Sequence, residues 1–233
     1  MNILAIDTSN QVMSTAVLNG DQLIAEYTTN VKKNHSVALM PAIDNILRDA
    51  GITPGEIHKI VVARGPGSYT GVRIGVTTAK TLAWTLNIPI TGVSSLEAAA
   101  YNGFYFPGLI CSFFDARRGR VFAAVYKRDG KQLIPVLEEK NIQFTDWLQE
   151  LKSQKEQVLF IGNNFSLHRE NIQELLGDQA VIAEAFMHIP RASVLGHIGK
   201  DRDAEDLHSF TPHYLRLAEA EAKWLQTRGN GHE

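Results

Sequence analysis

The sequence predicts an α/β protein of two duplicated lobes, each a mixed sheet flanked by helices. Short apolar runs alternate with helix-like segments along most of the 233 residues. In addition, the segment that opens at Ile6-Asp7-Thr8-Ser9 is similar to the one that opens at Phe114-Asp115-Ala116-Arg117, and each aspartate is followed at the same step by Ala-Val. The repeat indicates a duplicated unit whose hairpin turns just after the aspartate.

The first half of the chain is expected to begin with strands and to continue as alternating helix and strand. Strands are predicted near 2–7, 12–18, 22–29, 57–63 and from 89 to 93, and helices from 36 to 50 and from the glycine turn to 86. Ser36 is the expected cap of the first helix, and Leu39, Ile43 and Ile46 contribute to its apolar stripe.

The segment Ala63–Gly75 contains the most unusual pattern, in which a glycine turn leads into a helix with a stripe of small residues. It is not a phosphate loop, because no lysine follows Gly71, and its glycines are spaced one residue too widely for a dinucleotide fingerprint. In the helix, small residues recur every fourth position at Gly71, Gly75, Ala79 and Ala83. Each interior glycine costs about 1 kcal/mol relative to alanine, which suggests that close packing compensates. Spacing alone leaves open whether the stripe contacts its own sheet or a partner.

The second half is expected to repeat the pattern of strands followed by alternating helix and strand. Strands are predicted near 109–115, 120–127 and 157–161, and helices near 145–152, 166–176 and 214–226. The turn-forming stretch from Asn102 to Gly108 is the expected boundary, which gives lobes at 1–106 and 107–233.

Composition favours a compact protein of a reducing compartment, and we expect it in the cytoplasm. An apolar content of 44% supports a core in each lobe, and the formal charge of −2 predicts no broad basic surface, so any RNA contact is expected to be indirect. The single cysteine, Cys111, lies in an apolar run and is expected to be a buried, inert thiol. No signal peptide or membrane-spanning run is evident.

The search for catalytic chemistry finds few motifs. The histidines do not form a His-x-x-x-His pair, so no metal site is predicted, and no Gly-x-Ser-x-Gly elbow is present. Asp7, Thr8, Ser9 and Asp115 are candidates for nucleotide or interlobe contacts, although a short polar residue at a hairpin also serves its own turn. No catalytic residue and no cofactor are predicted.

Several of these segments together resemble the bacterial TsaB family, also called YeaZ. The resemblance rests on the opening strand with Asp7-Thr8-Ser9, on His35-Ser36, and on the long motif Gly65-Pro66-Gly67-Ser68-Tyr69-Thr70-Gly71-Val72-Arg73-Ile74-Gly75. Two further matches are Asp115-Ala116-Arg117-Arg118 and Pro212-His213-Tyr214-Leu215-Arg216, so the resemblance covers essentially the whole chain. It implies the actin-like fold of the superfamily that includes sugar kinases and Hsp70 (ASKHA, RNase H-like).

For function, the resemblance implies a non-catalytic subunit of the machinery that makes threonylcarbamoyladenosine beside the tRNA anticodon. The implied partners are the catalytic relative TsaD and the ATPase TsaE, with tRNA contacted indirectly, no membrane, and a homodimer when the chain is alone. Helices of the first lobe would form the interface, through Leu39, Ile43, Ile46, Gly71, Arg73, Gly75, Ala79 and Ala83. Two alternatives are a small-molecule kinase, whose phosphate hairpins are degenerate here, and a glycoprotease-like peptidase, for which the chain supplies no nucleophile or metal ligands.

Overall fold

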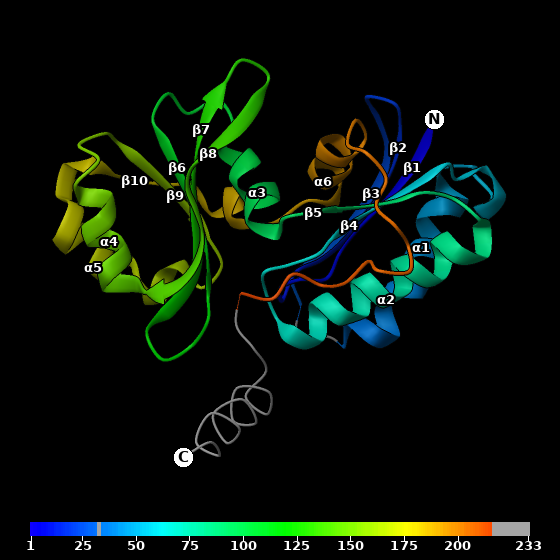
Figure 1. Ribbon diagram of the computed structural model, residues 1–233, viewed down its shortest axis with the longest axis horizontal. Helices are drawn as coiled ribbons and strands as arrows, with labels where there is room; N and C mark the ends of the chain where they lie inside the picture. The colour runs from blue at the N-terminus through cyan, green and yellow to red at the C-terminus, as the bar shows by residue number, and fades with distance from the viewer. Residues whose placement is uncertain (32–33, 216–233) are drawn as a thin grey trace, which may run out of the picture.

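The computed structural model describes residues 1–31 and 34–215, which form two lobes that each contain one five-stranded sheet (Figure 1). The first sheet has the order β3-β2-β1-β4-β5, formed by β1 (Asn2–Asp7), β2 (Met13–Asn19), β3 (Gln22–Thr29), β4 (Lys59–Ala63) and β5 (Ile90–Val93). The second has the order β10-β9-β6-β7-β8, formed by β6 (Leu109–Asp115), β7 (Arg120–Asp129), β8 (Gln132–Gln143), β9 (Val158–Gly162) and β10 (Ala180–Ile182).

The two sheets repeat the same topology, which confirms the duplication and the fold class predicted from the sequence. In the first sheet β1 is antiparallel to β2 and parallel to β4, and in the second sheet β6 is antiparallel to β7 and parallel to β9. The hairpins turn directly after Asp7 and Asp115, as the repeat predicted. The two aspartates therefore occupy equivalent positions at the ends of β1 and β6.

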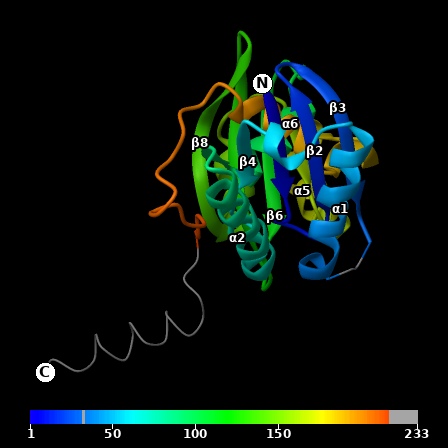
Figure 2. The same ribbon diagram turned by 90° about the vertical axis from the view of Figure 1, so that its right-hand side faces the viewer.

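Helices cover both faces of the first sheet (Figure 2). Alternate side chains of β1 face opposite sides, so Leu4 and Ile6 pack with α1 (His35–Asp49) and α2 (Tyr69–Leu86), whereas Ile3 and Ala5 pack with α6 (Ala192–Gly199). The first helix is capped by Asn34, whose Oδ1 accepts from the Ser36 backbone N–H at 3.1 Å, so the prediction of Ser36 as the cap is wrong by two residues.

In the second lobe, α4 (Phe144–Lys152) and α5 (Arg169–Leu176) cover one face of the sheet and α3 (Ser95–Ala100) covers the other. Cys111 is fully buried there, and its Sγ lies 3.3 Å from Trp147 Nε1. Burial raises the pKa of its thiol to about 12, which confirms the predicted inert cysteine. Among the described helices, none has both the length and the apolar character needed to cross a membrane.

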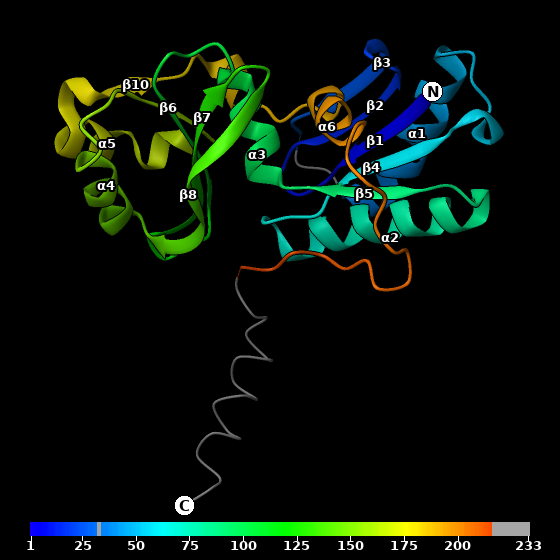
Figure 3. The same ribbon diagram turned by 45° about the horizontal axis from the view of Figure 1, so that its top comes forward.

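Four of the helices and strands were not predicted, namely α3, β8, β10 and α6. Most residues of α6 are buried and only His197 is exposed, while Gly196 and Gly199 approach Leu18 and Val61, so the helix shows only a weak amphipathic period. Although α6 lies within 107–233, it packs on the first sheet (Figure 3). The predicted helix over 214–226 lies, from residue 216 on, outside the described part of the chain.

Candidate functional site

The small-residue stripe of α2 packs against the loop that follows β1. A Cβ added at Gly75 would lie 2.5 Å from Thr8 Oγ1, and one added at Gly71 would lie still closer to the Thr8 carbonyl oxygen. The Thr8 hydroxyl donates to the Gly71 carbonyl at 2.7 Å, and the Ser68 backbone N–H donates to the Ser9 carbonyl at 2.7 Å. The glycines therefore allow the start of α2 to hydrogen-bond directly to the backbone of this loop.

This packing corrects most of the predicted partner interface. Of the eight predicted residues only Arg73 is exposed, and the other seven are buried within the first lobe: Leu39, Ile43, Ile46, Gly71, Gly75, Ala79 and Ala83. The stripe faces its own sheet and loop because that is the side on which Thr8 and Val62 lie. Of the two alternatives that the spacing left open, contact with its own lobe is the correct one.

The outer faces of α1 and α2 carry exposed apolar side chains, and we call them the α1–α2 surface. On α1, Val37 is 71% exposed and Met40 is 47% exposed, and on α2 Trp84 is 73% exposed. Val37 and Met40 lie near the start of α1, and Trp84 lies near the end of α2. Exposed apolar side chains on two neighbouring helices make this surface a candidate for contact with a partner.

Residues 203–215, which we call the strap, run along α2 and join the lobes (Figure 3). Lys80 on α2 donates to the Phe210 carbonyl at 2.7 Å, and the Phe210 ring is buried in the core of the first lobe. The ring of Tyr214 stacks on that of Tyr69 with centroids 5.0 Å apart, and Arg73 Nε donates to the Tyr214 hydroxyl at 3.1 Å. Arg73 is therefore exposed but already engaged in holding the strap.

A cavity of about 690 Å³ lies between the lobes beside the two aspartate hairpins. Asp7 itself is buried, and its Oδ1 accepts from the Ser9 backbone N–H at 2.8 Å. Burial raises the pKa of the Asp7 carboxyl above its ordinary value of 3.8, because desolvation outweighs the hydrogen bonds from Ser9. Asp115 lines the cavity, and its backbone N–H donates to Asn163 Oδ1 at 3.2 Å. The structure thus places both predicted aspartates near the lobe junction.

A direct hydrogen bond spans this junction. Asn163 Nδ2 in the second lobe donates to Asn10 Oδ1 in the first at 3.0 Å, and the Asn10 carbonyl lies 2.7 Å from His35 Nε2. Sequence reasoning missed Asn10 and Asn163, since neither belongs to a motif and they lie 153 residues apart. Together with Asp115 they link the two hairpins and narrow the cleft.

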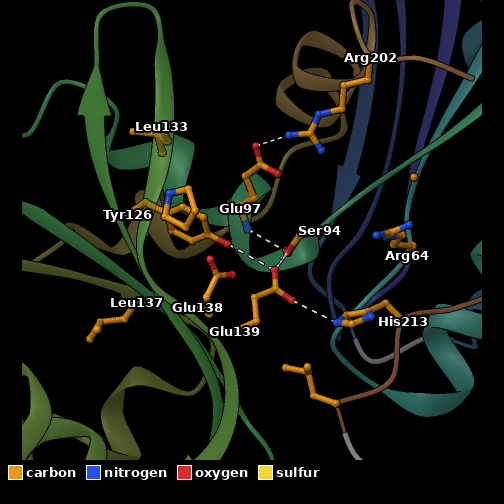
Figure 4. Close-up of a pocket in the computed structure, with 13 residues that line it drawn as sticks. Arg64, Ser94, Glu97, Tyr126, Leu133, Leu137, Glu138, Glu139, Arg202 and His213 are labelled. Carbon is orange, nitrogen blue, oxygen red and sulfur yellow. Dashed lines mark hydrogen bonds and ion pairs between the residues drawn. The ribbon is translucent and has the colours of Figure 1, made fainter.

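A second cavity, of about 520 Å³, lies on the other side of the junction (Figure 4). Glu139 of β8 lies at its centre, where Oε1 accepts from the Ser94 hydroxyl and from the Tyr126 hydroxyl, the latter at 3.4 Å. Its Oε2 lies 3.6 Å from His213 Nε2 of the strap. Burial is the main cause that raises the pKa of the Glu139 carboxyl.

Both arginines that line this second cavity are paired with carboxylates. Arg202 donates to Glu97 at 2.5 Å (Figure 4), and Arg64 donates to Glu205 at 3.0 Å. The cavity wall is therefore a set of contacts that join the second sheet, α3 and the strap. Among residues 1–31 and 34–215, no group of three His, Cys, Asp or Glu side chains is arranged to hold a metal ion.

Comparison with known proteins finds relatives whose names refer to the same tRNA modification. The family model described as "TsaD: tRNA N6-adenosine threonylcarbamoyltransferase" matches residues 12–224. A Bacillus subtilis (strain 168) protein named "tRNA threonylcarbamoyladenosine biosynthesis protein TsaB" is 52% identical over 228 residues, which cover 98% of this chain and 100% of that protein. The Escherichia coli (strain K12) protein of the same name is 36% identical over 131 residues, or 55% of this chain and 56% of that one.

Solved structures agree in fold. A structure titled "YeaZ from Pseudomonas aeruginosa" has a TM-score of 0.75 at 22% identity and covers 92% of this chain and 99% of its own. Another, described as an uncharacterized protein with similarity to peptidase YEAZ from the same organism, has a TM-score of 0.80 at 23% identity over the same shares. At these identities the likeness supports the two-lobed fold alone. Because the match to the Bacillus protein is 52% identical across nearly the whole of both chains, this chain belongs to the TsaB family.

Proposed function

We propose that this chain takes part in forming threonylcarbamoyladenosine beside the tRNA anticodon, in the cytoplasm, as a non-catalytic subunit. In this role it binds the catalytic TsaD subunit and activates it together with the ATPase TsaE. The observation that carries the proposal is the 52% identity to Bacillus subtilis TsaB over 98% of the chain. The match extends through both lobes and the strap, so it is not confined to one shared module.

The interlobe cleft supports a non-catalytic role. Asp7 is buried and is not among the residues that line the interlobe cavity, and one of its carboxyl oxygens already accepts from the Ser9 backbone N–H. Its carboxyl is therefore poorly placed to hold a metal–nucleotide complex in that cavity. The hydrogen bond between Asn163 and Asn10 crosses the cleft where a substrate would have to separate the lobes. These contacts suit a chain that acts by holding a partner.

The α1–α2 surface is the part of the molecule that we propose for the partner. Its exposed Val37, Met40 and Trp84 supply apolar area, and the buried faces of both helices fix them on their sheet. A second copy of this chain would use the same surface when TsaD is absent, which gives the proposed homodimer.

Reconstitution of the modification tests the proposal. We expect the purified chain alone to leave unmodified tRNA unchanged and to bind no ATP in isothermal titration with magnesium. Adding it to TsaD, TsaE and TsaC, the enzyme that the family resemblance implies as the source of the carbamoyl-adenylate co-substrate, should restore modification, measured by nucleoside analysis of the recovered tRNA. Full modification by TsaC, TsaD and TsaE without this chain would contradict the proposed role.

Val37→Glu and Val136→Glu form a matched pair for the surface. Both valines are exposed, but Val37 lies on α1 and Val136 lies on β8 of the second lobe. A carboxylate in the centre of an apolar interface is desolvated without a partner, so Val37→Glu should weaken association with TsaD at least tenfold in sedimentation. Val136→Glu should associate with TsaD as tightly as the native chain does. If the two variants associate equally well, the interface does not lie on the α1–α2 surface.

A further inference from the structure

A pocket of about 320 Å³ lies on the side of the molecule opposite the α1–α2 surface. It is formed where the turn after α3, the hairpin between β7 and β8, and the helix α6 meet, and α6 covers the opposite face of the first sheet from α1 and α2 (Figures 1 and 2). We call it the aromatic pocket, and its lining residues are Tyr101, Phe104, Tyr105, Arg128, Gly130, Lys131 and His197.

Three aromatic rings form one wall of the aromatic pocket. Tyr101 and Phe104 are stacked with centroids 5.4 Å apart, and Tyr105 stands perpendicular to Phe104 at 5.2 Å. Tyr105 is 83% exposed, the most exposed of the large apolar or aromatic side chains among the described residues. A ring held at the rim in this way offers a π-face to a planar ligand at a small cost in conformational entropy.

Positive charge lies directly against these rings. The Arg128 guanidinium carbon lies 4.8 Å from the Phe104 centroid and 5.1 Å from the Tyr105 centroid, and Arg128 Nε donates to the Gly130 carbonyl at 3.0 Å. Lys131 and His197 complete this side, and among the described lining residues there is no carboxylate. The acidic residues Glu97, Asp129 and Asp201 line the neighbouring cavity, which shares Tyr101, Lys131 and His197 with the aromatic pocket, whereas Arg128 lines the aromatic pocket and not that cavity. An anionic ligand is therefore favoured on the aromatic side.

We propose that the aromatic pocket binds an unstacked base of single-stranded RNA together with its phosphate. The base stacks on Tyr105, and the phosphate lies against Arg128 and Lys131, a combination of stacking platform and cations that suits single strands without base-specific hydrogen bonds. The volume is at the lower end for a small-molecule site, and the exposed ring would not enclose a free nucleotide, whereas a strand can pass across it.

The choice of RNA rests on the proposed function, in which tRNA is the substrate of the complex. The two surfaces are compatible, because a partner on α1 and α2 would leave the opposite side of the first lobe open. Direct contact with RNA would also correct the expectation, drawn from the net charge of −2, that any RNA connection is indirect. A local cluster of cations can bind a phosphate even when the chain as a whole is weakly acidic.

Fluorescence anisotropy with the full chain tests the inference. The probes are a labelled anticodon stem–loop RNA, a blunt RNA duplex of equal length, and AMP as competitor. The native chain should bind the stem–loop more tightly than the duplex, and AMP should compete only at far higher concentration. Tyr105→Ala should weaken binding about five- to 100-fold, whereas Tyr105→Phe, which keeps the ring, should bind like the native chain. Arg128→Ala should reduce the slope of log affinity against log salt by about 0.7.

Phe186→Ala is the matched control, since Phe186 is 74% exposed but does not line the pocket, and it should leave RNA binding unchanged. Thermal unfolding of every variant checks that the fold is intact.

The inference is overturned if the native chain does not bind the stem–loop, if Tyr105→Ala binds as the native chain does, or if AMP competes as well as RNA. If modification depends on the chain while Tyr105→Ala binds normally, only this inference fails. If binding depends on Tyr105 while modification does not need the chain, only the proposed function fails.

Discussion

At the scale of single residues, Asp7 is a carboxyl that is almost completely removed from solvent. It is buried at the end of β1, one carboxyl oxygen accepts from Ser9, and the other has no hydrogen-bond partner among the described residues. Because burial raises its pKa in the folded chain, the folded state binds a proton more readily than the unfolded state. The native chain therefore loses stability from this group as the pH rises through the raised pKa.

Replacing the carboxyl by an amide tests this pH dependence. Asp7→Asn keeps an acceptor for Ser9 and cannot ionise, so its free energy of unfolding should exceed that of the native chain at neutral pH. The difference should be absent below about the ordinary value of 3.8, grow as the pH rises through the folded pKa, and then stay constant. Urea unfolding at several pH values measures it. Asp49→Asn, at an exposed position of α1, should show no such growing difference, and a flat difference for Asp7→Asn would refute the assignment.

At the scale of elements, the start of α2 is fixed by its contact with the loop after β1. Gly71→Ala adds one methyl group, which would overlap the Thr8 carbonyl oxygen and press on a backbone that is held by two hydrogen bonds. The gain of about 1 kcal/mol in helix propensity opposes this overlap. Overpacking against backbone should prevail, so we expect a net loss of about 1–3 kcal/mol in the free energy of unfolding, measured in urea.

The control for this helix is Thr77→Ala, on the exposed face of α2, which should change stability by less than about 0.5 kcal/mol. A Gly71→Ala variant that is as stable as the native chain but no longer associates with TsaD would contradict the packing argument. That result would restore the stripe to the partner interface.

At the scale of the whole molecule, the two lobes are joined by contacts on both sides of the junction. One side has the hydrogen bond between Asn10 and Asn163, and the other has Glu139 with Ser94 and the strap. A double-mutant cycle of Asn10→Ala and Asn163→Ala should give a coupling energy of about 0.5–1.5 kcal/mol, since each single variant removes the same hydrogen bond. Urea unfolding of the four chains measures this energy.

A cycle between Asn10→Ala and Asn102→Ala is the comparison for that coupling. Asn102 makes two hydrogen bonds of its own, to the Met187 and Ile189 carbonyls, and shares no partner with Asn10. The two effects should therefore add within about 0.3–0.5 kcal/mol. Equal coupling energies in both cycles would mean that the hydrogen bond between Asn10 and Asn163 does not hold the lobes together.

Much of the fold could be predicted because its signals are local. The repeat from Asp7 to Ala16 and from Asp115 to Ala124 predicted both hairpins, and apolar runs located the central strands. The helix α6 could not be predicted, because most of it is buried and its glycines, which lie against Leu18 and Val61, weaken the amphipathic pattern. The Asn34 cap was missed because Ser36, two residues later, is an equally good capping residue.

The central strands of both sheets, the duplicated hairpins, the close packing required of α2 and, through its motifs, the family can all be read from local patterns in the sequence. Which surface the stripe on α2 meets depends on the three-dimensional packing, because a small side chain specifies close approach without specifying the neighbour. The tertiary structure also decided that Asn10 meets Asn163 and that Tyr105 and Arg128 share a pocket with His197 of α6. These contacts join residues far apart in the chain, whose proximity depends on how the two sheets and the strap pack and not on any local pattern of residues.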